Sequence, residues 1–163
     1  MAHVDIPVTP AVRLLREKGV RFEPLLYDYE DHGGAPRAAA ELDVPLHAVI
    51  KTLVMETEDR TPLLVLMHGD LEVSTKNLAR ALGVKRVAPC DPASAQRHTG
   101  YMVGGISPLG TRARIPVYAE STVLELDTIY LNGGKRGFLV ALSPTDLGRI
   151  IALTPVSVGI PLA

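Results

Sequence analysis

The stretch AVIKTLVME at residues 48–56, followed by TEDRTP at 57–62 and LLVLM at 63–67, decides the fold class. The first and third segments are apolar and rich in leucine and β-branched side chains, which is typical of buried strands. The middle segment is polar and contains proline, so it predicts a turn. The three segments together predict a buried β-hairpin.

Capping signals predict helices on both sides of this hairpin. Thr9-Pro10, Ser74, Asp91-Pro92 and Ser143-Pro144 each place a capping side chain at a helix start. A shorter helix is predicted at 38–42. Further strands are predicted at residues 21–29, 84–87, 115–118, 128–131, 137–141 and 153–158, with a turn at Asn132–Gly134. Because helices and strands mix without strict βαβ alternation, we expect one α/β domain of the mixed α+β type over residues 1–163, without linker or repeat.

Composition excludes several classes of protein. The chain has 17 Lys and Arg against 18 Asp and Glu, a net charge of −1, so it cannot bind nucleic acid through bulk positive charge. Hydrophobic residues make up 47% and charged residues 21%, which is ordinary for a folded domain. Disordered, collagen-like and coiled-coil chains are therefore excluded.

The cysteine and histidine content points to a reducing compartment and no metal. Cys90 is the single cysteine, and it cannot form an internal disulfide. It stands at a predicted helix start, which can lower a thiol pKa, but no histidine is near it in sequence, so a structural role is favoured. The five histidines lack metal-ligand spacing, and we expect no metal and no cofactor.

The ends of the chain predict a cytoplasmic protein that does not engage a membrane. Residues 1–10 lack the basic and apolar regions of a signal peptide. The uncharged tail at 150–163 is too short to span a bilayer and contains two prolines.

The segment TGYMVGGISPLG at 99–110 is rich in glycine, which lets backbone N–H groups approach a ligand closely. A plain surface turn is the alternative. Gly105 to Gly110 has the spacing of a phosphate-binding loop, but Thr111-Arg112 follows in place of Lys-Ser/Thr. Ser107 is a weak candidate nucleophile, because the glycine that would close a nucleophile elbow comes one residue late.

Several cations are candidates for binding a ligand. Lys51 interrupts the apolar run, so its amine either reaches water along the strand or points into a pocket, toward a phosphate or an oxyanion. The segment NGGKRG at 132–137 predicts a hairpin tip with two cations. Arg112 and Arg114 could join Lys85 and Arg86 in a local basic face, or all of them could be solvated.

Three motifs in order resemble one family. KTLV at 51–54, the loop at 99–110 and GGKRG at 133–137 resemble the YbaK/EbsC family of aminoacyl-tRNA editing domains. The resemblance extends over residues 9–158. It implies a mixed β-sheet or partial barrel surrounded by helices.

The resemblance also implies an activity, which is hydrolysis in trans of mischarged Cys-tRNA(Pro) by attack of the substrate's own thiol. Lys51 would be the essential side chain. Tyr27, Thr52 and Asn132 would line the substrate pocket, with the backbone of Gly104, Gly105, Ile106 and Ser107. Arg112, Arg114, Lys135 and Arg136 would contact tRNA. The expected partners are the acceptor end of tRNA(Pro) and prolyl-tRNA synthetase.

Three positions depart from the family pattern. Leu139 stands where many relatives have an acidic residue, Asn132 replaces a serine, and Gly34 lies near the place of an aromatic residue. The departures leave two alternatives open: a deacylase for another small amino acid such as alanine, and a non-catalytic module that binds tRNA or the synthetase.

Overall fold

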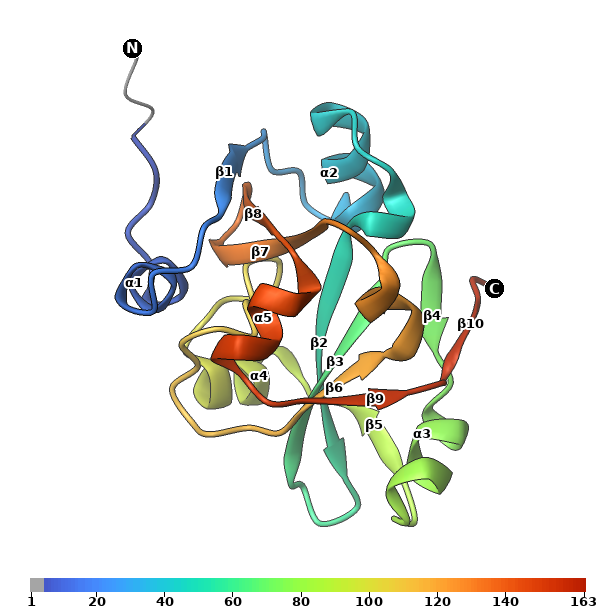
Figure 1. Ribbon diagram of the computed structural model, residues 1–163. Helices are drawn as coiled ribbons and strands as arrows, with labels where there is room; N and C mark the ends of the chain where they lie inside the picture. The colour runs from blue at the N-terminus through green and yellow to red at the C-terminus, as the bar shows by residue number, and fades with distance from the viewer. Residues whose placement is uncertain (1–4) are drawn as a thin grey trace.

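The computed structural model describes residues 5–163, which form helices and strands in a mixed α/β arrangement (Figure 1). The α-helices are α1 (Pro10–Glu17), α2 (Gly34–Leu42), α3 (Thr75–Leu82), α4 (Pro92–Thr99) and α5 (Pro144–Ile150). Two 3-10 helices are η1 (Leu46–Ala48) and η2 (Ser121–Glu125). The strands are β1 (Glu23–Leu26), β2 (Ile50–Thr57), β3 (Pro62–His68), β4 (Leu71–Val73), β5 (Val87–Pro89), β6 (Val117–Glu120), β7 (Ile129–Lys135), β8 (Phe138–Leu142), β9 (Leu153–Val156) and β10 (Gly159–Pro161).

A five-stranded mixed sheet forms the centre of the molecule, in the order β5-β2-β3-β6-β9. Strands β2 and β3 pair antiparallel, with Ile50 opposite His68 and Glu56 opposite Pro62, so the predicted hairpin is confirmed. The pairs β3–β6 and β6–β9 are parallel. The mixed sheet agrees with the fold that the family resemblance implies, and β9, within the predicted strand at 153–158, lies at its edge.

Strand β3 is buried on both faces. Leu64 and Leu66 point into one hydrophobic cluster, and Val65 and Met67 point into another on the opposite side. Because side chains alternate along a strand, a residue run that is apolar without interruption fits only a strand covered on both sides. This burial explains the sequence LLVLM.

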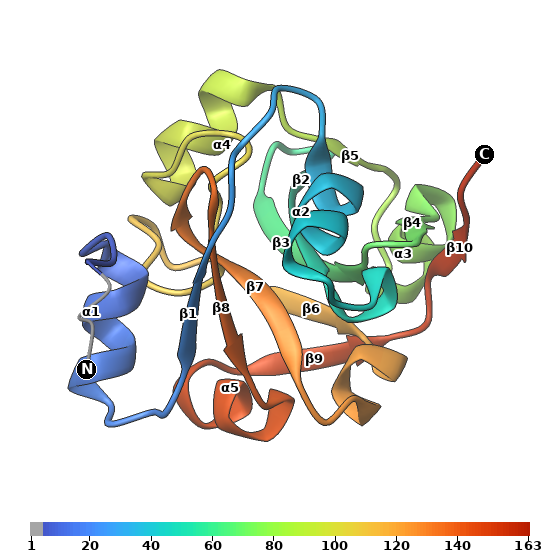
Figure 2. The same cartoon turned by 90° about the horizontal axis from the view of Figure 1, so that it is seen from above.

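A second, three-stranded sheet has the order β1-β8-β7, and β4 pairs with β10. In Figure 2, β1, β8 and β7 lie side by side, with α1 and α2 on either side of them. A parallel bridge between Val49 and Tyr130 connects the start of β2 to β7. Helix α2 packs Ala38 and Ala39 against Val49 and Leu139 at this junction.

The predicted caps form as the sequence indicates. The side chains of Thr9, Ser74, Asp91 and Ser143 each accept a hydrogen bond from a backbone N–H in the first helical turn. The helices therefore begin at the predicted residues.

Some predictions were wrong in position. Helix α2 begins at Gly34 rather than at 38, and β5 lies at 87–89 rather than at 84–87. The turn predicted at Asn132–Gly134 lies instead at Arg136–Gly137, because a register shift between Asn132 and Lys135 takes both glycines into β7. The short strands β4 and β10 were not predicted.

No helix within residues 5–163 has the length and apolar character needed to cross a bilayer. The prediction that no signal peptide is present falls partly on residues 1–4, which lie outside the described residues.

Replacing Gly133 with alanine should destabilise the protein. The added methyl group would overlap the ring of Phe138, which is fully buried, so we expect a loss of about 1–3 kcal/mol in the free energy of unfolding. Gly148→Ala in α5 is the matched control, because nothing lies within 4 Å of the added atom. It should instead raise stability by about 0.5–1 kcal/mol, since alanine favours helix. Urea denaturation measures both variants, and equal stabilities would contradict the prediction.

Candidate active site

A cavity of about 430 Å³ opens at an edge of the central sheet. Strand β5 pairs with β2 only at Met55–Thr57, so residues 50–53 have no β5 partner on this edge. These four residues line the cavity together with parts of α2, the β7–β8 hairpin and the loop that follows α4. The site therefore forms where the sheet leaves half of a strand uncovered.

The cavity brings together residues that are distant in sequence. Of the predicted site residues, those that line it are Tyr27, Lys51, Thr52, Gly104, Ile106, Asn132 and Arg136. Gly105, Ser107 and Lys135 adjoin lining residues in sequence without lining the cavity themselves. Tyr29, Asp31 and His32 also line the cavity, from the segment between β1 and α2, and no motif or spacing marked them as site residues.

Lys51 lies half-buried in the cavity wall. Its Nζ donates a hydrogen bond to the carbonyl oxygen of Leu71, and an ammonium group has two further hydrogens to donate. Burial lowers the pKa of Lys51, and the nearby carboxylates of Glu72 and Asp70 oppose this shift. One hydrogen bond thus anchors the cation while leaving it able to bind an anionic or carbonyl oxygen.

Thr52 presents two kinds of unused polar group. Its Oγ1 is buried and has no hydrogen-bond partner within residues 5–163, and an unpaired buried hydroxyl costs about 1–3 kcal/mol. The carbonyl of Val54 accepts from the N–H of Cys90 at the β5 edge. Because backbone groups two residues apart point to the same edge of a strand, the N–H and C=O of Thr52 point toward the uncovered part. A ligand in the cavity could satisfy these groups.

The side chain of Asn132 connects the loop at residues 99–110, which we call the glycine loop, to the β7–β8 hairpin. Its Nδ2 donates to the carbonyl of Gly104 at 3.0 Å, and its Oδ1 accepts from the N–H groups of Gly134 at 2.7 Å and Lys135 at 3.2 Å. In these three hydrogen bonds the side-chain amide of Asn132 binds backbone groups of the protein itself. Asn132, predicted to bind substrate, thus lines the cavity while it positions the loop.

Arg136 makes a second attachment of the same loop. Its Nε donates to the carbonyl of Val103 at 2.9 Å, and its guanidinium lies 5.1 Å from the centre of the Tyr29 ring. Gly104 has φ +93°, and a Cβ there would come within 2.6 Å of the Tyr29 hydroxyl. Only glycine allows this close approach of loop and ring.

The loop leaves some of its backbone N–H groups available. The N–H of Gly105 already donates to the carbonyl of Met102 at 2.8 Å, so it is not open to a ligand. No hydrogen bond of residues 5–163 uses the N–H of Gly104 or Ile106. These two groups are the loop's candidates for binding an oxyanion.

Ser107 is fully buried, and its Oγ accepts from the N–H of Leu109 at 3.1 Å. The hydroxyl therefore holds the turn of the loop and is not presented at the cavity wall, which argues against a nucleophilic role.

Part of the cavity lining is apolar and includes Ala35, Ala38, Val49 and Leu139. Burial, with neighbouring Tyr29, raises the pKa of Tyr27, so its hydroxyl remains neutral at pH 7. The lining suits a small uncharged side chain.

The predicted basic residues separate into three places. Arg136 lies at the cavity, whereas Arg112 and Arg114 line a different cavity beside α5. Lys85 and Arg86 follow α3, which lies across the molecule from α1 and α5 in both views (Figures 1 and 2). The structure does not bring these two residues into a common basic face with Arg112 and Arg114.

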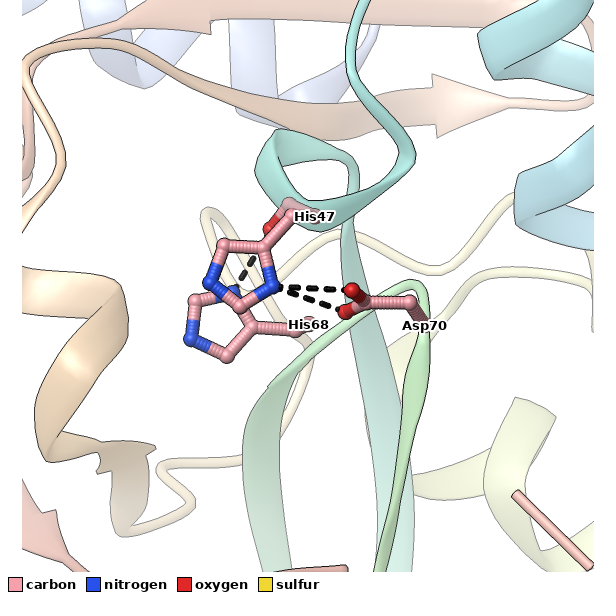
Figure 3. Close-up of side chains that lie close together, drawn as sticks. All are labelled: His47, His68 and Asp70. Atoms are coloured by element: carbon pink, nitrogen blue, oxygen red, sulfur yellow. Dashed lines mark hydrogen bonds and ion pairs between the residues drawn. The ribbon is translucent and has the colours of Figure 1, made fainter. Parts of the chain in front are cut away.

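His47, His68 and Asp70 form a cluster whose potential ligand atoms lie within 4.8 Å of one another (Figure 3). The two imidazole rings stack with centres 3.6 Å apart and an angle of 7° between their planes. A metal ion lies near the plane of each imidazole that binds it, at about 2.1 Å from the nitrogen, so parallel stacked rings cannot share one ion.

Hydrogen bonds in this cluster explain its arrangement instead. His68 is buried, with Nδ1 2.6 Å from the carbonyl of His47 and Nε2 2.7 Å from the Thr122 hydroxyl. Nδ1 of His47 lies 2.9 Å from a carboxylate oxygen of Asp70. The cluster fixes the β3–β4 turn, and the next residue, Leu71, supplies the carbonyl that holds Lys51.

Cys90 lies outside the lining of the cavity. Burial, with Glu56 beside it, raises the pKa of the Cys90 thiol to about 11. The protonated thiol is a poor nucleophile, so the structural role favoured by the sequence agrees with its surroundings.

Comparisons with known proteins give a consistent result. A model of the aminoacyl-tRNA editing domain family matches residues 31–150. EbsC of Enterococcus faecalis, provisionally named a Cys-tRNA(Pro)/Cys-tRNA(Cys) deacylase, is 30% identical over 147 residues, which are 90% of this chain and 88% of that protein. A proline–tRNA ligase of Brachyspira hyodysenteriae is 30% identical over 86 residues, 53% of this chain and 15% of the ligase.

A solved structure, provisionally described as a trans-editing enzyme for prolyl-tRNA synthetase, superposes with a TM-score of 0.81. The match covers 94% of this chain and 99% of that chain at 19% identity. At this identity the match shows that the fold is shared.

Asn132→Asp should loosen the glycine loop. The carboxylate keeps the acceptor for Gly134 but cannot donate to the carbonyl of Gly104. Losing a hydrogen bond worth about 1 kcal/mol should speed amide hydrogen exchange at residues 102–106 by roughly three- to tenfold. Lys135→Ala, at the exposed neighbouring position, is the control and should leave the exchange unchanged. Unaltered protection in the Asp variant would show that Asn132 does not hold the loop.

Cys90 should react slowly with iodoacetamide near neutral pH. With a thiol pKa of about 11, the alkylation rate should still be rising at pH 10. Glu56→Gln removes a carboxylate that disfavours the thiolate, so it should lower the pKa and speed alkylation at pH 8. The rate is followed by mass spectrometry, with Cys90→Ser as the unreactive control. A plateau below pH 9 in the native chain would be the opposite result.

Proposed function

The chain belongs to the aminoacyl-tRNA editing domain family, and on that premise we propose that it hydrolyses mischarged Cys-tRNA(Pro) in trans. One observation carries the proposal: Lys51 and the glycine loop line the same cavity. The name of the Enterococcus relative and the agreement of its length with this chain add support.

The cavity can hold the aminoacylated end of a tRNA. The two remaining N–H groups of Lys51 bind the terminal phosphate or the ester carbonyl. The N–H groups of Gly104 and Ile106 stabilise the oxyanion that develops on that carbonyl. The apolar wall at Ala38 and Leu139 accepts the small side chain. Thr52 binds the ribose or the α-amino group through its unpaired hydroxyl.

The substrate supplies its own nucleophile in this proposal. The cysteine sulfur attacks its ester carbonyl carbon, a C–S bond forms, and the C–O bond to the ribose breaks. The thiol proton ends on the released ribose hydroxyl, and water then hydrolyses the thiolactone to free cysteine. The cavity supports this route because Ser107 is buried and Cys90 lies outside it. Positioning and oxyanion stabilisation then supply the acceleration.

A hydrolytic site separate from the synthetase active site is useful when cysteine must be distinguished from proline. Cysteine and proline are similar in size, and binding alone separates such near-isosteres poorly. A thiol-dependent step accepts cysteine and spares proline, which has no thiol. The wall formed by Ala35, Ala38 and Leu139 would also accept alanine, so a deacylase for Ala-tRNA(Pro) is the second candidate.

We further propose that the protein acts in the cytoplasm on the acceptor end of tRNA(Pro), beside prolyl-tRNA synthetase. The family's role in translation and the similarity to segments of proline–tRNA ligases support this partner. With a net charge of −1, the chain benefits from a synthetase that supplies tRNA identity.

Lys51→Ala should lower kcat/KM for Cys-tRNA(Pro) by about 10²- to 10³-fold, because it removes the cation that faces the reacting ester. Lys51→Met retains the apolar stem without the charge and should lose activity equally while preserving the thermal midpoint. Loss of the ester from radiolabelled Cys-tRNA(Pro) measures the rate. Cys90→Ser, outside the cavity, is the control and should keep full activity.

The same assay with tRNA(Pro) charged separately with Cys, Ala and Pro tests the substrate. We expect rapid loss of the cysteinyl ester and retention of the other two. Equal rates for Cys and Ala would exclude the thiol mechanism and favour the second candidate. Full activity of both Lys51 variants would refute the role of this residue.

A further inference from the structure

Two adjoining cavities outside the candidate active site have charged lining residues that are almost all cations. One, of about 740 Å³, lies between the end of the glycine loop, the start of β6 and the residues after α5. The other, of about 320 Å³, lies between the end of α1 and α5. Ile150 lines both. Their charged lining residues are Lys18, Arg21, Arg112, Arg114 and Arg149, with Asp146 as the single acid.

We call the five cations the basic face. The chain as a whole has slightly more acids than bases, 18 against 17, so five cations beside one acid are a local excess. All five are exposed. Arg149 pairs with Asp146 at 3.0 Å, whereas Lys18, Arg21, Arg112 and Arg114 form no ion pair within residues 5–163. The excess charge therefore remains open to a ligand.

Three separate parts of the chain build the basic face. Lys18 and Arg21 follow α1, Arg149 belongs to α5, and Arg112 and Arg114 end the glycine loop. Gly110 allows that loop to lie close to α1, since a Cβ at this position would come within 2.8 Å of the backbone of Pro10. The loop that carries the candidate oxyanion donors is thus directly continuous with the basic face.

Resting on the proposed function, we propose that the basic face binds the sugar–phosphate backbone of the tRNA acceptor stem. Guanidinium groups bind phosphate oxygens in pairs, and contacts to phosphates orient a nucleic acid without reading its sequence. The face would orient the stem while the aminoacylated end enters the cavity at Lys51.

The absence of large exposed hydrophobic and aromatic side chains from the lining of these two cavities favours RNA over a protein partner. Protein interfaces have an apolar, often aromatic, core. The large exposed hydrophobic side chains of the described residues are Val8, Leu26, Met102, Val103 and Leu162, and none of them lines the two cavities. No aromatic residue lines them either.

The cations at the active-site cavity are already held by other groups of the protein. Nε of Arg136 donates to the carbonyl of Val103 and its guanidinium lies over the ring of Tyr29, and Nζ of Lys51 donates one hydrogen bond to Leu71. These two residues lie where the aminoacylated end of the tRNA would bind. Binding of the acceptor stem therefore requires cations elsewhere on the protein.

The test removes four cations together, in a variant with Lys18, Arg21, Arg112 and Arg114 changed to alanine. The matched control changes Lys76, Arg80, Lys85 and Arg86, four exposed cations in or after α3, to alanine and alters net charge equally. Thermal midpoints establish that both variants fold, and the double variants Lys18→Ala/Arg21→Ala and Arg112→Ala/Arg114→Ala test the face if the fourfold variant does not.

Binding of uncharged tRNA(Pro) is measured over a range of salt concentrations. We expect the basic-face variant to bind at least about tenfold more weakly at low salt, with a plot of log Kd against log salt that is less steep by about 0.7–0.9 for each lost phosphate contact. The control should keep the native slope. Equal weakening of both variants, or of neither, would overturn the proposal.

Hydrolysis of two substrates separates this proposal from the proposed function. For Cys-tRNA(Pro), KM should rise in the basic-face variant, whereas 3′-O-cysteinyl-adenosine, which has no stem, should be hydrolysed at the native rate. If the native protein hydrolyses neither substrate, the proposed function fails, and the binding measurement still decides the basic face. If the variant loses only its binding to prolyl-tRNA synthetase and keeps its tRNA affinity, the face is a protein-docking surface and the proposal is wrong.

Discussion

Side-chain alternation along the β2–β3 hairpin is the constraint on which the rest of the molecule depends. Strand β3 supplies residues to hydrophobic clusters on both faces of the sheet, so its position in the middle of the sheet is fixed by burial. Its partner β2 is covered by β5 along only part of its length. The uncovered part, residues 50–53, carries Lys51 and Thr52 into a cavity. The same hairpin thus builds the core and exposes the site.

The site is organised by hydrogen bonds between side chains and backbone carbonyl groups. Asn132 and Arg136 hold the glycine loop through its carbonyl groups, and no group within residues 5–163 accepts a hydrogen bond from the N–H of Gly104 or Ile106. Leu71 holds Lys51 in the same way, on a turn fixed by the stacked histidines. Preorganised donors of this kind stabilise developing negative charge without rearrangement. Such a site suits the proposed substrate, an ester whose acyl group carries its own thiol.

The structure divides the cations into two groups that the sequence alone could not distinguish. Arg136 lines the active-site cavity, whereas Arg112 and Arg114 lie beside α5, near the cations Lys18 and Arg21 that follow α1. The net charge of −1 is a sum over the whole chain and does not show where the cations gather. A chain with no overall basic character can therefore hold a local surface suited to phosphates.

The sequence by itself determined the elements whose signals are local: the central hairpin, the capped starts of α1, α3, α4 and α5, and the family motifs at Lys51 and the glycine loop. These follow from side-chain periodicity and capping, which act over a few residues. The tertiary structure alone decided that Asn132 serves the loop, that Ser107 is buried, that Tyr29 supports Arg136, and that β7 extends through Lys135. Each of these depends on contacts between residues far apart in the chain, and a single sequence does not show which distant residues come into contact.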